Sequence, residues 1–267
     1  MKKQETANTY RKRGQSQPDI SFEIEMRRKI QKEVDEMMAD IEKKAYALWT
    51  NDRANDEMNF PKWYIVQMMK EIRNAWYGRF QDLAREISPM MAYKADIRTQ
   101  RQIIMKMRDY GFTIEHRPTD AQKLIARIFA MDTVALIKTI PQAVAEQAQE
   151  AVMHAWEQGY DMKELTDSLE RIGNYGRDKA QLVARDQMNK ITQKMAIANA
   201  QSVGVSKGRW IHVPGYKSSR KTHIAFDREI FDLQQGLYDT DVREWVKPGE
   251  LPYCNCQFQI IAPGFDE

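Results

Sequence analysis

The sequence predicts an α+β protein, with a predominantly helical N-terminal region followed by a small C-terminal module of strands and loops. Two observations predict this division. From residue 21 onward apolar residues recur at spacings of three and four, which is the period of a helix with one buried face. After Gly204, short β-prone pieces separated by Pro and Gly replace these stripes. We therefore expect a flexible basic arm at 1–20, a helical domain at 21–204 and the α+β module at 205–267.

Length and composition argue against a strongly basic nucleic-acid-binding protein and against a membrane protein. The 267 residues suffice for one large domain or two modest ones, and 41 basic against 38 acidic residues leave a net charge of only +3. The strong overall basicity of many nucleic-acid-binding proteins is thus absent. The sequence has no apolar run of the length that crosses a membrane and no secretory signal at its start. We expect a soluble protein made in the cytosol, without membrane contact.

The first 17 residues depart from this charge balance. They hold five basic residues and one acidic residue, and Tyr10 is their one side chain large and apolar enough to anchor them. We expect an arm that either contacts DNA or an acidic protein surface, or only keeps the protein soluble. Arg11, Lys12 and Arg13 are candidate binding residues of this arm.

Two apolar stripes define the first helices. They run through residues 26–48 and 65–87 and contain many Met and aromatic side chains, which at this spacing are typical of a protein core. Pro61 suits the first turn of the second helix, and Ser88-Pro89 is expected to end that helix.

Boundary signals continue along the helical domain. Thr119 and Gln122 form a capping-box pattern ahead of a helix that must stop or kink at Pro141. Gly173 and Gly204 lie at positions typical of helix C-caps. Residues 21–204 are therefore expected to be almost entirely helical.

The module contains two strand candidates, RWIHV at 209–213 and CQFQII at 256–261, each flanked by turn residues. Cys254 and Cys256 are the two cysteines of the chain. A disulfide across Cys-x-Cys would be strained and disfavoured in a reducing cytosol. On an extended strand, both side chains would point to the same side.

Two thiolates and the imidazole of His223 form a donor set that suits zinc. His223, Cys254 and Cys256 are therefore candidate metal ligands, and zinc is one of two alternatives for this cluster. The fourth ligand is open between His212, Asp227 and a water. The alternative is a metal-free cluster of packed thiols hydrogen-bonded with Arg220, which is also a candidate binding residue.

The module resembles a known family. "RWIHV", "SSRKTHIAFD" and "KPGELPYCNCQF" follow the order and approximate spacing of a tryptophan strand, an Arg-x-x-His step and a Cys-x-Cys ending. This pattern is similar to that of the phage Mu F-like head-morphogenesis proteins, also called minor capsid proteins. Upstream, "ALIKTIPQ" and "LVARDQMNKI" resemble the family's helix break and the helix that leads into its module. The resemblance covers residues 120–267 and implies an all-helical N-terminal half.

What the resemblance implies is a structural and assembly protein of a tailed-phage head. It would be a minor capsid protein associated with the portal, acting in head morphogenesis and in DNA packaging or ejection. The implied partners are the portal protein and the major capsid or scaffold protein, with a weak contact to DNA. The implied location is the virion, at the capsid interior or the portal vertex, and the host cytoplasm during assembly.

Catalysis is not expected from the sequence. It contains no phosphate-binding loop, no Gly-x-Ser-x-Gly elbow and no His-Glu-x-x-His helix. The alternative function is a metal-dependent enzyme acting on nucleic acid or nucleotide. A closed four-ligand site, or no metal, would favour the structural function, and an open site in a basic cleft would favour the enzyme.

Overall fold

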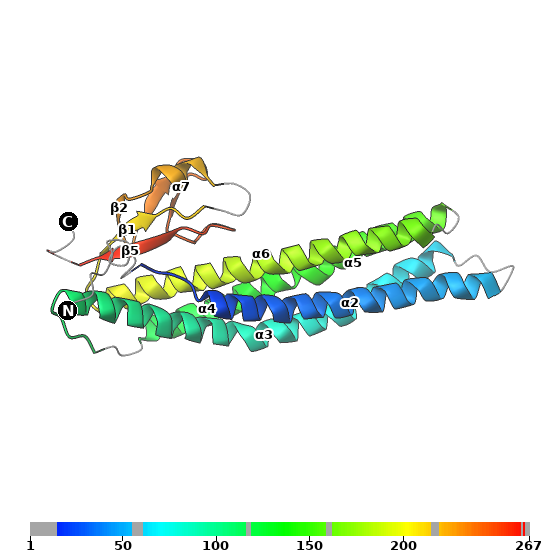
Figure 1. Ribbon diagram of the computed structural model, residues 1–267, viewed down its shortest axis with the longest axis horizontal. Helices are drawn as coiled ribbons and strands as arrows, with labels where there is room; N and C mark the ends of the chain where they lie inside the picture. The colour runs from blue at the N-terminus through cyan, green and yellow to red at the C-terminus, as the bar shows by residue number, and fades with distance from the viewer. Residues whose placement is uncertain are drawn as a thin grey trace, which may run out of the picture. The chain divides into compact units, whose positions relative to one another are not determined.

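A computed structural model describes residues 15–54, 61–115, 119–158, 162–214, 219–262 and 264, without side chains at 49–54. Long helices come first and a small strand-containing module follows, which confirms the predicted α+β fold (Figure 1). The elements are α2 (Ile20–Ala54), α3 (Lys62–Asp109), α4 (Asp120–Ile137), α5 (Thr139–Glu157), α6 (Met162–Ser202), β1 (Lys207–Ile211), α7 (Lys221–Ala225), β2 (Ile230–Asp232), β3 (Leu237–Asp239), β4 (Glu244–Val246) and β5 (Gln257–Ile261). None of the described helices is both long and apolar enough to cross a membrane.

The described residues divide into two compact units. Ile24–Ile87 and Met131–Ala184 form what we call the helical unit. The described residues up to Glu23, together with Ser88–Ala130 and those from Arg185 onward, form the mixed unit. The C-terminal module therefore shares its unit with the C-terminal part of α6. That residues 205–267 are a domain of their own stays a prediction.

The two predicted stripes form the core of the helical unit. Every predicted position from Met26 to Leu48 on α2 is buried, and so are most of those from Ile65 to Ile87 on α3. Helices α6 and α2 approach closely at Gly176, where an added Cβ would lie 2.7 Å from Val34 Cγ1. A glycine is thus required for this helix contact.

Helix α3 continues through Pro89, so the end predicted at Ser88-Pro89 is wrong. A proline inside a helix removes one hydrogen bond and crowds the preceding turn, at a cost of about 3 kcal/mol. The helix persists because Met91, Ala92 and Ala95 are buried and extend its apolar face beyond the proline.

The other helix ends follow local signals in most cases. Gln122 N–H and Thr119 Oγ1 lie 3.4 Å apart, and Thr119 N–H donates to Gln122 Oε1 at 2.6 Å, as predicted for a capping box. The helix is interrupted between α4 and α5, as expected, and Pro141 lies in the first turn of α5. Gly173 lies inside α6, so the C-cap predicted there is wrong: buried residues of α6 continue on both sides of it.

Gly204 ends α6, as predicted. Its φ is +82°, and its N–H donates to the Gln201 carbonyl at 3.0 Å. The N–H of Val205 reaches back to the Ala200 carbonyl, also at 3.0 Å. These two bonds form a Schellman motif, which satisfies helix-end carbonyls and turns the chain into β1.

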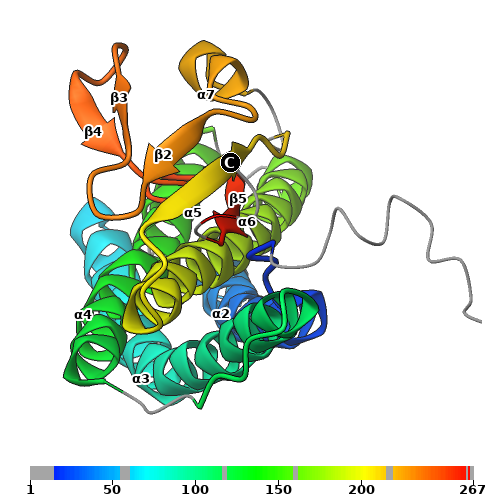
Figure 2. The same cartoon turned by 90° about the vertical axis from the view of Figure 1, so that its left-hand side faces the viewer.

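The module is built on a three-stranded antiparallel sheet of order β2-β1-β5. The predicted strands RWIHV and CQFQII correspond to β1 and β5, which pair from Lys207↔Ile261 to Ile211↔Gln257. Trp210 and Phe258 are fully buried in the core of this unit, which also includes Ala200 of α6. In Figure 2, α7 and the β3–β4 hairpin lie above the sheet strands, and the C-terminal part of α6 lies below them.

Gln15 and Ser16, which precede α2, contact β5 and α6 within the mixed unit. Gln15 forms a β-bridge with Gln259 of β5. Ser16 donates its N–H to the Phe258 carbonyl at 2.8 Å, and its hydroxyl donates to the side chain of Gln193 on α6. The proposed arm residues Arg11, Lys12 and Arg13 lie outside the described part of the chain.

Candidate metal centre

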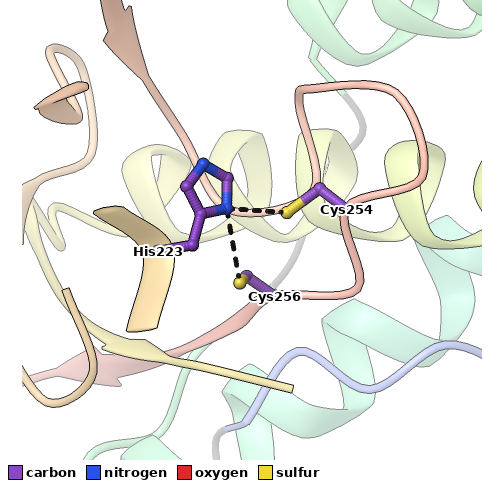
Figure 3. A group of neighbouring side chains, drawn as sticks. All are labelled: His223, Cys254 and Cys256. Atoms are coloured by element: carbon purple, nitrogen blue, oxygen red, sulfur yellow. Dashed lines mark hydrogen bonds between the residues drawn. The ribbon is translucent and has the colours of Figure 1, made fainter. Parts of the chain in front are cut away.

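Three potential ligands meet inside the mixed unit. The donor atoms of His223, Cys254 and Cys256 all lie within 4.8 Å of one another, and all three residues are buried. Nδ1 of His223 lies 3.3 Å from Cys254 Sγ and 3.7 Å from Cys256 Sγ, as Figure 3 shows. These are the residues that the sequence nominates as metal ligands, and their donor set can hold a metal ion. That they do so stays a prediction.

Helix α6 fixes the loop that carries the cysteines. Tyr253 adopts a left-handed backbone with φ of +58°, and its N–H donates to Asp186 Oδ1 at 2.6 Å. The amide of Asn189 donates to the carbonyls of Cys254 at 2.7 Å and Cys256 at 3.3 Å. The loop is therefore held through its backbone by buried polar side chains of α6, which leaves both sulfur atoms available to His223.

Helix α7 and the β3–β4 hairpin orient the imidazole. His223 is 2% exposed, and the edge of its ring contacts the Trp210 ring with centroids 5.3 Å apart. Its Nε2 lies 3.2 Å from Oδ2 of Asp239. Asp239 is fully buried, and Thr222 Oγ1 donates to it at 3.1 Å. A carboxylate behind a histidine is a frequent arrangement around metal-bound imidazoles, because it orients the ring.

The two thiols have opposite electrostatic environments. A hydrogen bond from the Cys256 thiol, together with the neighbouring His223, lowers the pKa of Cys254 to about 4. The adjacent Cys254 thiolate and burial raise the pKa of Cys256, although the Val213 backbone and the Trp210 indole oppose this shift. The environment thus favours ionisation of Cys254 and disfavours ionisation of Cys256. Thiolate is the form in which cysteine binds metals.

The remaining candidates lie around this cluster. His212 Nδ1 is 3.6 Å from Cys256 Sγ. Asp227 accepts a hydrogen bond from the His212 backbone N–H at 2.8 Å. Arg220 is half-buried and donates to the carbonyl of Pro252, at 3.0 Å, in the loop that carries the cysteines.

Sequence reasoning missed the residues that support the cluster. Asp186 and Asn189 are polar residues on a buried face of α6, and this break in the apolar pattern was the available signal. Asp239 is the last residue of the short strand β3, and no sequence signal marks it as the partner of His223.

Comparison with known proteins identifies the segment that contains this cluster. Residues 146–259 match the model of a family described as Phage Mu protein F like protein. The chain carries a Mu F-like region. This region begins within α5 and ends within β5, so it includes His223, Cys254 and Cys256. The predicted family resemblance is thereby confirmed.

One relative is similar to part of this chain. An uncharacterized protein of Haemophilus influenzae (strain ATCC 51907 / DSM 11121 / KW20 / Rd) is 27% identical over 148 residues. The match covers 55% of this chain but 31% of that protein. No solved structure matches the chain.

Proposed function

We propose that the protein is a minor capsid protein of a tailed-phage head, bound at the portal and acting in head morphogenesis and in DNA packaging or ejection. The observation that carries this proposal is the Mu F-like region at 146–259, because that family suggests a phage head morphogenesis protein. The portal protein and the major capsid or scaffold protein are the proposed partners. The virion, at the portal vertex or capsid interior, is the proposed location.

The β3–β4 hairpin is our proposed contact with a virion protein. Tyr238 and Trp245 face each other across it, with ring centroids 5.7 Å apart, and are 47% and 52% exposed. Large aromatic side chains are enriched at the centres of protein interfaces, where their burial dominates the binding energy. A partner that covers this pair would remove both rings from water.

Particle incorporation tests this proposal. Heads assembled in cells that express the full chain should contain it, with density at the portal vertex, and the double variant Tyr238→Ala/Trp245→Ala should be depleted from them. Trp63→Ala is the matched control, because Trp63 is 65% exposed and packs edge-on against Tyr64 outside the Mu F-like region. Normal, infectious heads that lack the chain would refute the proposed role, and equal incorporation of the variant would refute the contact.

We also propose that the His223, Cys254 and Cys256 cluster holds zinc and that this zinc stabilises the module. A small module gains much of its stability from such a link, because its hydrophobic core is limited. Elemental analysis of the purified full chain should find one zinc per chain. Cys256→Ser should lose it and become protease-sensitive after Gly204, while the helices remain folded. An intact module in this variant would refute the stabilising role.

The basic arm and Arg220 are proposed to make a weak contact with DNA. Each lysine or arginine that neutralises a phosphate releases counterions, so the affinity of such a contact falls steeply with salt. Replacing Arg11, Lys12 and Arg13 with alanine should lower the slope of log affinity against log salt concentration by about 3. An unchanged slope would place the DNA contact elsewhere.

A further inference from the structure

The donor distances around Cys254 and Cys256 match the edges of a zinc tetrahedron. Zn–S bonds of about 2.3 Å and Zn–N bonds of about 2.0–2.1 Å at the tetrahedral angle place sulfur and nitrogen about 3.6 Å apart. The distances from His223 Nδ1 to the two sulfur atoms are 3.3 and 3.7 Å, and that from His212 Nδ1 to Cys256 Sγ is 3.6 Å. A site with two sulfur and two nitrogen ligands has four such edges, and three of them are already present.

We propose that His212 Nδ1 is the fourth ligand, so that zinc would be bound by two imidazoles and two thiolates in a closed site. This inference rests on the proposed zinc site and extends it. A closed site leaves no coordination position for a substrate or a reactive water, which is the arrangement of structural zinc.

The surroundings of His212 favour it over Asp227. The carboxylate of Asp227 accepts the His212 backbone N–H at 2.8 Å, so it positions the main chain of the histidine. His212 lies outside the group of three donors that are all within 4.8 Å of one another. Its side chain is partly buried, and a turn of its ring toward Cys254 would complete the tetrahedron.

A buried polar atom beside Cys256 also indicates a metal-bound thiolate. Trp210 Nε1 is buried and has no hydrogen-bond partner among the described residues. Trp210 and Cys256 belong to the same buried cluster. A buried N–H without an acceptor costs about 1–3 kcal/mol. A thiolate at Cys256, held ionised by zinc, would supply that acceptor.

X-ray absorption of the zinc-loaded full chain tests the ligand set directly. We expect two sulfur and two nitrogen ligands in the wild-type protein, and cobalt in place of zinc should give the intense visible bands of a tetrahedral site. His212→Ala should lose one nitrogen ligand, weaken these bands and bind zinc more than about 100-fold more weakly, since outer-shell changes alone cost about 10–100-fold. His154→Ala is the control, because His154 pairs with Glu164 in the helical unit.

The outcomes separate this inference from the proposal on which it rests. Zinc bound in the wild type by two sulfur atoms, one nitrogen and an oxygen, with unchanged affinity in His212→Ala, would overturn the role of His212 and keep the zinc site. A wild-type chain that takes up no zinc would overturn both. The helical circular dichroism of His212→Ala should remain that of the wild type. The X-ray absorption spectrum of the wild type decides the ligand set even if the variant misfolds.

Discussion

Replacing Asn189 with alanine should release the cysteine loop from α6 while the helices stay folded. The Asn189 amide is buried and donates to two backbone carbonyls, at 2.7 Å to Cys254 and at 3.3 Å to Cys256. It also accepts from Gln193 Nε2 at 3.1 Å. A buried polar group left without its partner costs about 1–3 kcal/mol. The second bond is long, so we expect a total loss of about 2–4 kcal/mol.

Urea unfolding and limited proteolysis measure this loss. Asn189→Ala should lower the stability of the module and expose cleavage sites after Gly204, and Asn189→Asp should be worse, because it turns a carboxylate toward the two carbonyls. Asn174→Ala is the control on the same helix: Asn174 is exposed, and its change should stay within about 0.5 kcal/mol. If Asn189→Ala and Asn174→Ala have equal stability and protease resistance, the loop is not held by α6 in the way described.

Further predictions concern the core, the metal and the N-terminal segment. Gly176→Ala should destabilise the protein by about 1–2 kcal/mol, because overpacking against Val34 outweighs the higher helix propensity of alanine. Gly78→Ala has open space around it and should stabilise the protein by up to about 1 kcal/mol. Thermal unfolding should therefore show a lower midpoint for the first variant and a higher midpoint for the second. Ile72→Asp buries a charge in the helical unit and should abolish soluble expression, and full-level soluble protein would contradict its place in the core. Zinc affinity should fall as the pH is lowered from about 8 to about 5.5, because protons compete with zinc for imidazoles and thiolates; a pH-independent titration would argue against these ligands. Deleting residues 1–17 should lower the unfolding midpoint, because Ser16 is buried and bonded to Gln193, and an unchanged midpoint would contradict this contact.

The sequence predicts best what depends on regular spacing. The stripes at 26–48 and 65–87 identified core positions because a helix repeats its buried face at a fixed period. The break predicted at Pro89 failed because a local rule cannot include the burial of Met91 and Ala92 beyond it. The burial of several apolar side chains can offset the cost of a proline inside a helix, which is about 3 kcal/mol.

The candidate ligands could be predicted from the sequence, but the residues that position them could not. Cys254, Cys256 and His223 are chemically distinctive, so residue type alone nominates them. Asn189 and Asp239 are ordinary polar residues, and their importance comes from positions that only the fold creates. Asn189 lies 65 residues before Cys254 along the chain, and no local pattern links the two.

The β-bridge and hydrogen bonds between the segment at 15–17 and β5 can form only after β5 has been synthesised. Ser16 and Phe258 are separated by 242 residues, so one partner leaves the ribosome long before the other exists. At about 5–20 residues per second, Ser16 waits about 12–48 s for its acceptor. A chain interrupted before β5 would leave Ser16 without Phe258 and the sheet without one of its strands. The mixed unit can therefore be completed only in a chain that has been synthesised through β5.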